Sequence, residues 1–323
     1  MYKTEMPNWK RKCFFLKYGI KGQLSKLKGI MKADKLSLLR ALNDNRDVFP
    51  HQLGITAILK NEANYVQEWI EFHKLVGVTK FYLFDNDSED DLEDRLKPYI
   101  LEGTVELHKK YGHGKQREVY EEAIAMAKNE TRWLAILDLD EFLLPLGNES
   151  VLDILNEKKR SAMLIGWMIY GSNGFVKRPK GLVLENYRKH ATDELLADYK
   201  IIINPRKAIR VVNPHFVQVF GATTDETGKR IWAYPYKTDP QALPAPKKRV
   251  RINHYYSKSL EEFQMKSQRG FADNNGKVKK NPRGMSDFKK HDQNLEEDDA
   301  VNVYLPKLRM AMKLRNNDQS DNS

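Results

Sequence analysis

Two aspartates separated by one residue stand out in this sequence, within the segment Asp138-Leu139-Asp140-Glu141-Phe142. They follow the apolar run Trp133–Leu137, which we expect to be a buried strand. Side chains alternate across a strand, so both carboxylates should lie on the same side of it and face one crevice. Such a pair is costly unless a cation lies beside it. Mg²⁺ and Mn²⁺ prefer carboxylate and phosphate oxygens, so Asp138 and Asp140 are predicted metal ligands.

The alternative for this motif is a simple helix cap, because Asp-Leu-Asp is a common tripeptide. Apolar residues lie on both sides of it, at 133–137 and again at 142–145, and they favour a buried site instead. A metal held there would bridge the diphosphate of a nucleotide sugar and stabilise the charge that develops as it leaves.

Polar clusters also follow two earlier predicted strands. Lys60-Asn61-Glu62 comes after the strand at 55–59, and Asp85-Asn86-Asp87-Ser88 comes after the strand at 81–84. A further strand is expected at 104–107, and the predicted helices are 65–76, one through Leu92 and Leu96 that ends at Pro98, and 119–127. This alternation predicts an α/β protein with right-handed βαβ units and a mostly parallel sheet between helices. In such sheets ligands bind at the carboxyl ends of the strands.

The pattern changes after residue 150. Strands are expected at 161–170, 199–204 and 250–253, and we interpret them as mixed strands that extend the first sheet. A helix is expected at 257–267 and a mobile polar loop at 272–294. The division of the chain that we predict is a basic, partly helical arm over 1–50, one catalytic domain over 51–310, and a disordered tail over 311–323, most clearly from Asn316.

Several segments, taken together and in this order, resemble glycosyltransferase family 92 and related family-2-like enzymes of the GT-A fold. They are Ile58-Leu-Lys-Asn-Glu62, Phe84-Asp-Asn-Asp-Ser88, Leu137-Asp-Leu-Asp-Glu-Phe142, Trp167 with Gly171–Gly174, Lys200 with Asn204-Pro205, Asn253-His-Tyr-Tyr-Ser-Lys258, and Arg269-Gly270. The similarity covers about residues 54–305. Animal members typically carry a membrane-spanning anchor before this domain, and no stretch of residues 1–323 has the roughly 20 apolar residues that a span needs.

The resemblance implies a role for particular residues. It makes His254 a later ligand of the metal held by Asp138 and Asp140, either Mn²⁺ or Mg²⁺, although a packed histidine is the alternative. It assigns these residues to the donor site: Lys60, Asn61, Glu62, Asp85, Asn86, Gln116, Asp138 and Trp167. Gly171–Gly174 would flank the sugar and the acceptor, and Lys258 and Arg269 would meet phosphate. His215 matches a histidine segment of the family without a role that we can assign.

The resemblance also favours transfer with inversion at the anomeric carbon, in which a carboxylate takes the proton of the acceptor hydroxyl. The sequence leaves this base unassigned. Asp225 and Glu226 are weak candidates and Asp193 and Glu194 are rivals, since each also fits a solvated loop acid. The donor suggested is a uridine diphosphate sugar such as UDP-galactose, and the acceptor a glycan or glycolipid.

The charge of the chain is concentrated at its beginning. Of the net +11, residues 1–50 carry +8, with twelve Lys or Arg against four Asp or Glu. This arm also has aromatic residues, so it fits either an anionic membrane surface, through residues 9–32, or a solvated tail. Cys13 is the only cysteine, which fits a reducing, cytoplasmic setting. A cytoplasmic enzyme with such an arm would suit lipopolysaccharide, capsule or other surface-glycan synthesis.

Three other functions fit the sequence less well. A nucleotide-sugar-forming nucleotidyltransferase would show a glycine-rich loop after the first strand, and residues 60–64 contain no glycine. A non-catalytic basic protein that binds nucleic acid would need cations and aromatics interleaved on the folded domain, where acids follow the strands instead. A catalytically dead member would tolerate loss of the aspartate pair, which is intact here.

Overall fold

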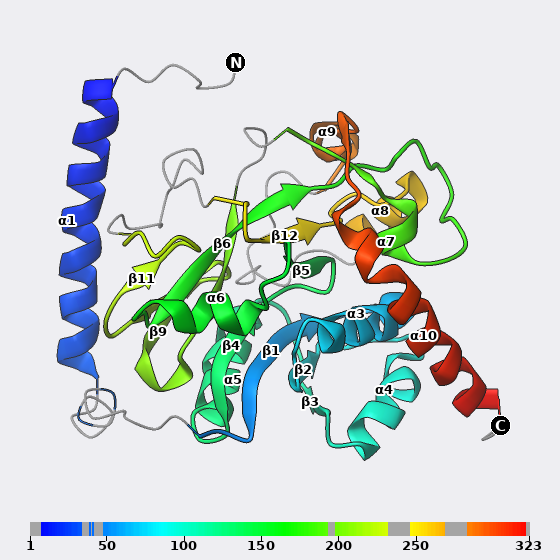
Figure 1. Ribbon diagram of the computed structural model, residues 1–323, viewed down its shortest axis with the longest axis horizontal. Coiled ribbons are helices and arrows are strands. Elements are labelled where there is room, and N and C mark those ends of the chain that lie inside the picture. Colours follow the sequence, from blue (N-terminus) through cyan, green and yellow to red (C-terminus); the bar gives the residue numbers. More distant parts are fainter. Residues whose placement is uncertain are drawn as a thin grey trace.

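The computed structural model describes residues 8–33, 39, 41, 48–192, 198–231, 246–268 and 283–320, and it is an α/β protein (Figure 1). Three predicted site residues, Asp193, Glu194 and Arg269, lie outside the described residues.

The first part of the domain alternates strands and helices, as predicted. Its elements are β1 (His51–Leu59), α3 (Ala63–Leu75), β2 (Lys80–Asp85), α4 (Leu92–Leu101), β3 (Val105–Lys109), α5 (Gln116–Ala127) and β4 (Thr131–Ile136). Strand β1 pairs in parallel with both β2 and β4, and β2 pairs in parallel with β3. The carboxyl ends of these strands therefore lie at one edge of the sheet.

Helix α4 differs from its prediction, because it continues through Pro98 to Leu101. Proline removes one hydrogen bond from a helix interior and usually ends it. Here Leu96 and Tyr99 are fully buried on either side of the proline, and the Glu102 amide still donates to the Pro98 carbonyl at 3.0 Å. Burial of these side chains offsets the lost hydrogen bond.

The later strands extend the same sheet, as predicted. They are β5 (Glu141–Pro145), β6 (Ala162–Ile169), β8 (Tyr199–Ile203), β11 (Thr223–Thr224) and β12 (Val250–His254). The strand order is β3-β2-β1-β4-β8-β6-β12-β5, with β11 paired to β6. Strand β8 is antiparallel to β4 and β6, whereas β12 is parallel to β6 and antiparallel to β5. The predicted Rossmann-like, GT-A-type sheet with a mixed extension is confirmed.

Smaller elements complete the described chain. They are α1 (Asn8–Lys32), α6 (Val151–Glu157), α7 (Val183–Asn186), β7 (Lys189–His190), η1 (Pro205–Lys207), β9 (Ala208–Asn213), β10 (Phe216–Val219), α8 (Leu260–Gln268), α9 (Met285–His291), β13 (Glu296–Glu297), η4 (Ala300–Val303) and α10 (Leu305–Ser320). Helix α9 falls within 272–294, where the composition predicted a loop. Helix α10 reaches Ser320, where it predicted disorder. Arg315 of α10 pairs with Glu71 and Glu102, which fixes this helix on α3 and α4. The division of the chain into arm, domain and tail stays a prediction.

Apolar side chains form a core on each face of the sheet. Strand β2 shows the alternation, since Phe81 and Leu83 pack on the α3 side while Tyr82 and Phe84 pack on the α5 side. Because both faces are covered, the edge where the strands end is the part of the sheet left to polar residues.

Candidate functional site

The loops after β1 and β2 are tied together at the carboxyl edge of the sheet. The Asn61 amide donates to Ser88 Oγ at 3.0 Å, and Asn61 Oδ1 accepts the Glu89 amide at 2.7 Å. Asn61 has a φ of 52°, a left-handed conformation that asparagine tolerates better than most residues. Lys60, Asn61 and Glu62 are therefore held in a fixed loop next to Asp85, and their part in a donor site stays a prediction.

Asp85 and Asn86 are buried and bind neighbouring groups. Asp85 accepts the Ser88 amide at 2.9 Å and the Lys109 ammonium at 2.9 Å. Burial works against ionisation, but these contacts outweigh it and leave the pKa of Asp85 below its usual value. The Asn86 amide group donates to the carbonyls of Lys110 and Gly112. These two side chains hold the ends of β2 and β3 together.

The Asp138–Asp140 motif lies in a turn between β4 and β5 rather than on a strand. The expectation that a pleat aligns both carboxylates therefore does not apply. In the turn, the Glu141 amide donates to the Asp138 carbonyl at 3.1 Å, and Glu141 Oε2 accepts the Asp138 amide at 2.9 Å. The two aspartates consequently face different cations.

Asp138 faces Lys200, a fully buried lysine on β8. Lys200 Nζ lies 2.8 Å from Asp138 Oδ2 and 3.3 Å from Glu141 Oε2. Burial opposes the charge on Lys200, but the two carboxylates keep its pKa well above its usual value. Lys200 in turn keeps the pKa of Asp138 below its usual value in spite of burial, whereas burial raises the pKa of Glu141 well above it.

The other oxygen of Asp138 accepts hydrogen bonds from α5. Gln116 Nε2 lies 3.2 Å from Asp138 Oδ1, and the Tyr120 hydroxyl lies 3.3 Å from it. Gln116 is also bonded to Tyr120 at 2.8 Å. The structure thus places Gln116 beside the acidic motif, and its predicted contact with the donor stays a prediction.

Asp140 faces a different set of groups. Lys266 of α8 donates to Asp140 Oδ2, and His254 Nε2 lies 3.5 Å from Asp140 Oδ1. Burial opposes ionisation of Asp140, yet Lys266 and His254 hold its pKa well below the usual value. Burial lowers the pKa of His254 more than Asp140 raises it. A charged carboxylate and a neutral imidazole are the forms in which these residues bind metals.

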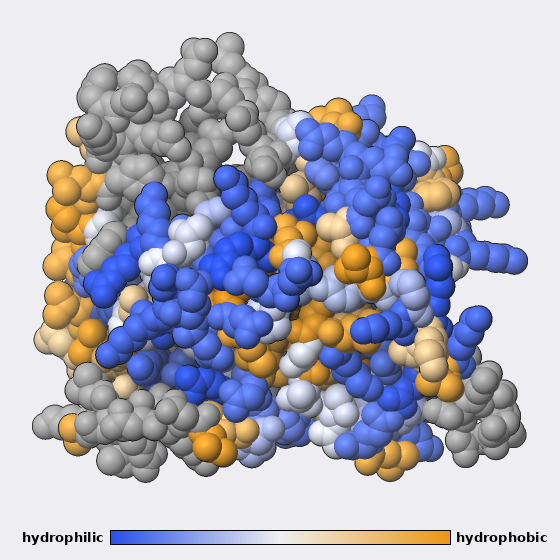
Figure 2. All heavy atoms as spheres, viewed as in Figure 1, coloured by the Kyte–Doolittle hydropathy of each residue, from blue (hydrophilic) through white to orange (hydrophobic). Residues whose placement is uncertain are grey.

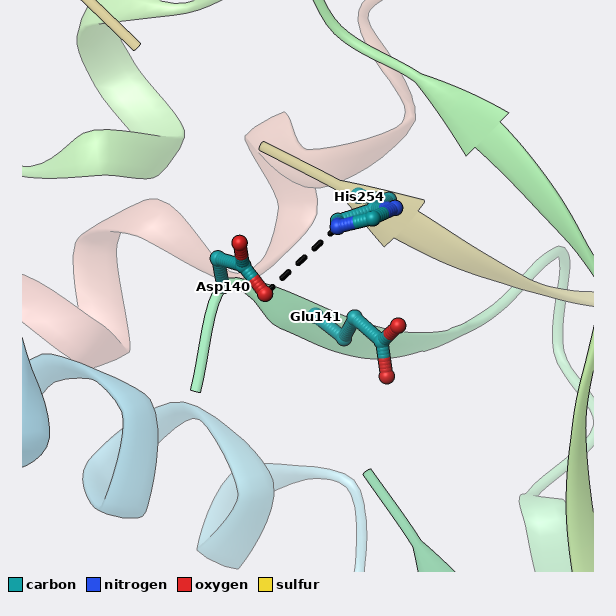
Figure 3. A group of neighbouring side chains, drawn as sticks. All are labelled: Asp140, Glu141 and His254. Atoms are coloured by element: carbon teal, nitrogen blue, oxygen red, sulfur yellow. Dashed lines mark ion pairs between the residues drawn. The ribbon is translucent and has the colours of Figure 1, made fainter. Parts of the chain in front are cut away.

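Asp140, Glu141 and His254 form a group that fits a divalent cation (Figure 3). Each offers a ligand atom, and these atoms lie within 4.8 Å of one another. Two buried atoms of the group, Glu141 Oε1 and His254 Nδ1, have no hydrogen-bond partner among the described residues. Buried polar atoms are nearly always paired, so this pair points to a ligand that binds here. Asp138 is outside the group, and its role as a metal ligand stays a prediction.

Trp167 lies against His254, with ring centroids 4.3 Å apart, and its ring centroid is 5.2 Å from that of His215. The indole Nε1 is buried without a partner among the described residues. His215 Nδ1 is 3.1 Å from the Tyr199 carbonyl, which anchors its ring in the wall of the site. Trp167 and His215 therefore lie beside the metal group, and a contact of Trp167 with the donor stays a prediction.

Lys258 and the segment Gly171–Gly174 lie in loops close to this group. Lys258 has a φ of 48°, and its ammonium lies 3.9 Å from the centre of the Tyr65 ring. The Ser172 amide donates to Asp292 at 2.7 Å, and the Asn173 amide donates to Asn294 at 2.7 Å. Contacts of either segment with phosphate or sugar stay predictions.

The weak candidates for the catalytic base, Asp225 and Glu226, lie at the far ends of the strands. They follow β11, which pairs with the first residues of β6, whereas His254 pairs with the last. Asp225 Oδ1 accepts the amides of Thr227 and Lys229, and Glu226 accepts those of Lys248, Arg249 and Val250. Strand β6 is eight residues long, so roughly 23 Å of strand separates the two ends. Both acids stabilise loops there.

Four residues of this site had no predicted role: Tyr120, Glu141, Lys200 and Lys266. Lys200 carries a signal that could have revealed it, because it interrupts the apolar strand Tyr199–Ile203 and a buried charge needs a partner. Glu141 stands beside the aspartates in the motif itself. Lys266 lies on a helix of mostly polar residues and has no such signal.

Comparisons with known proteins agree on one family. The model of glycosyltransferase family 92 matches residues 56–298. A glycosyltransferase family 92 protein of Oryza sativa subsp. japonica is 27% identical over 176 residues, which are 52% of this chain and 29% of the rice protein. One from Arabidopsis thaliana is 29% identical over 93 residues, 28% of this chain and 16% of that protein. The matched segments thus span less than a third of these relatives.

Solved structures show weaker similarity. Residues 1–349 of TarS from S. aureus are 15% identical at a TM-score of 0.33, with 48% of this chain and 47% of that chain covered. The mannosyltransferase PcManGT from Pyrobaculum calidifontis, solved with GDP-Man and Mn²⁺, is 16% identical at a TM-score of 0.28, with 45% of each chain covered. Scores this low support no argument about the site.

Proposed function

This chain belongs to glycosyltransferase family 92, and from that membership we propose that it transfers a sugar from a nucleotide-sugar donor to an acceptor hydroxyl, in a metal-dependent reaction. The observation that carries the proposal is the group Asp140, Glu141 and His254, which lies beside the Asp138–Lys200 pair where β4 ends. Acidic and imidazole ligands at the carboxyl edge of an α/β sheet suit a diphosphate with its cation.

The metal, Mn²⁺ or Mg²⁺, would be held by Asp140 and His254 with Glu141, and it would supply positive charge to the departing diphosphate. Asp140 already carries the required charge, and the His254 ring is fixed by Trp167 on one side. Lys266 now occupies one oxygen of Asp140, so its ammonium is the group that a bound cation would displace. Once displaced, it is well placed to bind phosphate oxygens.

Asp138 has a different task in this proposal. Its Oδ1 accepts from Gln116 and Tyr120 while its Oδ2 is bound to Lys200, so its orientation is fixed from both sides. A carboxylate held in this way can accept a hydrogen bond from a donor ribose hydroxyl without reorganising. The loops at Lys60–Glu62 and Asp85–Asn86 would form the floor under the nucleotide base, for which we propose uracil.

The acceptor side is less defined. Inversion needs a base on the face opposite the leaving diphosphate, and Asp225 and Glu226 are placed unfavourably for it at the other end of β6. We therefore leave the base unassigned. A glycan or glycolipid of a cell-surface pathway remains our proposal for the acceptor, and the cytoplasm our proposal for the location.

Isothermal titration calorimetry of the chain with UDP tests the donor site. We expect binding with Mn²⁺ present, at least tenfold weaker binding in EDTA, and the same loss in Asp140→Asn with Mn²⁺. Asp94→Asn is the matched control, because Asp94 is an exposed aspartate on α4. Mixing the chain with UDP-galactose or UDP-glucose, Mn²⁺ and candidate acceptors should then release UDP only when an acceptor is present.

Three outcomes would change the proposal. Binding of GDP or CMP in place of UDP would retain the transferase and replace the donor. A nucleotidyltransferase would instead form nucleotide sugar and pyrophosphate from UTP and a sugar 1-phosphate. Absence of metal-dependent binding to any nucleotide would contradict the proposal as a whole.

A further inference from the structure

Within the described part of the chain, helix α1 contacts the domain through one face. Lys26 Nζ donates to the Gly221 carbonyl at 2.8 Å, and Gln218 Nε2 lies 3.3 Å from Ser25 Oγ. At Gly29 the helix approaches so closely that a Cβ would lie 2.9 Å from Ile209 Cγ2. The inner face is thus defined by small residues, by Ser25 and by Lys26, and these contacts fix how the helix is turned.

The opposite face of α1 carries a stripe of exposed apolar side chains. These side chains are between 54% and 81% exposed, and they are Leu16, Ile20, Leu24, Leu27 and Met31. Their spacing of four, four, three and four residues aligns them along one side of a helix. At about 100° per residue, the centre of the stripe lies about 180° from that of Gly22, Ser25 and Gly29. The apolar face therefore points directly away from the domain.

Figure 2 shows this surface as apolar atoms along the edge of the molecule where Figure 1 places α1. Beside the stripe runs a row of exposed cations: Lys17, Lys21, Lys28 and Lys32. Among the described residues, no helix is long and apolar enough to cross a membrane. A helix with an apolar stripe, a cationic flank and low overall hydrophobicity has the features of one that lies in the interface of a bilayer.

The charge of α1 indicates which kind of partner covers the apolar stripe. Residues 8–32 contain eight Lys or Arg and no Asp or Glu. Two copies of α1 packed stripe to stripe would bring two such cationic rows together, which is unfavourable. Anionic headgroups complement these cations, and the acyl region just below accepts the apolar side chains.

We propose that α1 docks this protein on an anionic bilayer surface, with the stripe from Leu16 to Met31 inserted in the plane of the interface and the lysine row against the headgroups. The stripe spans sixteen residues, or about 22 Å of helix from the first to the last. Helix α1 contacts Gly221 and Arg210, near the first residues of β6, whereas the metal group lies near its last residues. The docking surface and the donor site are thus separate.

Sedimentation of the full chain with vesicles tests the proposal. We expect binding to vesicles of 70% phosphatidylcholine and 30% phosphatidylglycerol, and at least tenfold weaker binding to pure phosphatidylcholine. The triple variant Ile20→Ser, Leu24→Ser, Leu27→Ser should bind the anionic vesicles at least tenfold more weakly. The triple variant Lys17→Gln, Lys21→Gln, Lys28→Gln should bind about two orders of magnitude more weakly, because each cation near such a surface contributes about fivefold.

A matched control replaces three exposed apolar residues on other elements, Leu101→Ser, Val303→Ser and Met310→Ser, and should bind as the wild type does. Cys13 offers a direct probe, since this exposed residue is the only cysteine and falls on the line of the stripe. An environment-sensitive fluorophore on Cys13 should shift to the blue with anionic vesicles. The same fluorophore on a Cys13→Ser, Leu101→Cys chain should not shift.

Three results would overturn the proposal: no binding to anionic vesicles, equal binding by the apolar variant and the wild type, or an unshifted probe on Cys13. A dimer in light scattering that the apolar variant dissociates, without vesicle binding, would identify the stripe as a contact between copies instead. Metal-dependent UDP binding should be equal in the wild type and both α1 variants. A wrong proposal about membrane docking can thereby be distinguished from a wrong proposal about the transferase activity.

Discussion

Lys200 Nζ lies 2.8 Å from Asp138 Oδ2, although the two residues are 62 positions apart: Lys200 is on β8, and Asp138 is in the turn after β4, the strand antiparallel to β8. The side chain of Lys200 is fully buried, so the pair is shielded from water on the side of the core. This contact connects the extension of the sheet to the acidic turn, and its removal has a predictable effect.

Replacement of Lys200 by methionine should destabilise the protein strongly. Asp138 and Glu141 would be left without their cation, and breaking a buried pair typically costs about 3–5 kcal/mol. The double variant Lys200→Met, Glu141→Gln should be less destabilised than Lys200→Met alone, because it leaves one carboxylate fewer. Urea unfolding at pH 7 measures both, and a cost below about 1 kcal/mol for the single variant would contradict the prediction.

Divalent metal should stabilise the folded chain. A ligand that binds only the folded state contributes about 2.7 kcal/mol at a concentration one hundred times its Kd. We expect Mn²⁺ to raise the melting temperature, EDTA to reverse the rise, and His254→Ala to abolish most of it. The exposed aspartate variant Asp94→Asn should respond as the wild type does. An equal rise in His254→Ala would place the metal elsewhere.

The protein should become less stable as the pH is lowered, because of the buried His73, which lies outside the site. Its Nδ1 is 2.8 Å from the Trp69 carbonyl, and its Nε2 accepts the Leu143 amide at 3.1 Å, so the ring is neutral. Burial lowers the pKa of His73 to about 3. The folded state therefore binds fewer protons than the unfolded state between about pH 6.5 and pH 3, and its stability is complete only above that range.

Within this range the free energy of unfolding should drop by up to about 1.4 kcal/mol per pH unit through this one group. His73→Gln removes the titration, so the difference between wild type and variant should shrink as the pH falls from 7 to 4.5. Urea unfolding at several pH values measures that difference. A difference that stays constant with pH would show that His73 is not the group responsible.

Alanine at Gly171 should disturb the loop that packs against residues 292–294. A Cβ there would lie 2.3 Å from Asn294 Oδ1 and 2.9 Å from the Gln293 carbonyl, a backbone atom that cannot rotate away. We expect a loss of about 1–3 kcal/mol and faster hydrogen exchange over residues 285–298. Gly171→Ala combined with Asn294→Ala should recover only part of the loss, since the contact with the carbonyl remains.

Much of the fold could be predicted because the first half of the chain has strong periodicity. Polar clusters stand at the ends of β1, β2 and β4, and the parallel order of these strands places Asn61, Asp85 and Asp138 at one edge. The structure of segments with weak periodicity was harder to predict. Helix α10 forms beyond Asn316 because Arg315 and buried Leu308 attach it to the domain, and neither contact is visible in composition.

Only part of the site could be predicted, because some of its contacts depend on tertiary packing. The resemblance identified Asp140 and His254, and the structure brings them together. The pairing of Asp138 with Lys200, and the grouping of Glu141 with the proposed metal ligands, depend on how an antiparallel strand and a turn meet in space. Such contacts follow from tertiary packing, which the local sequence does not encode.

The order of strands in the sheet has a consequence for synthesis on the ribosome. Strand β12 lies between β6 and β5, both of which emerge from the ribosome more than 80 residues earlier. A nascent chain that stops before residue 250 has the loops at 60–62 and 85–86 but a gap where β12 belongs. His254 is the last residue of this strand, paired with Glu141. The metal group is therefore assembled only by the insertion that closes the sheet, and a prematurely terminated chain would lack it.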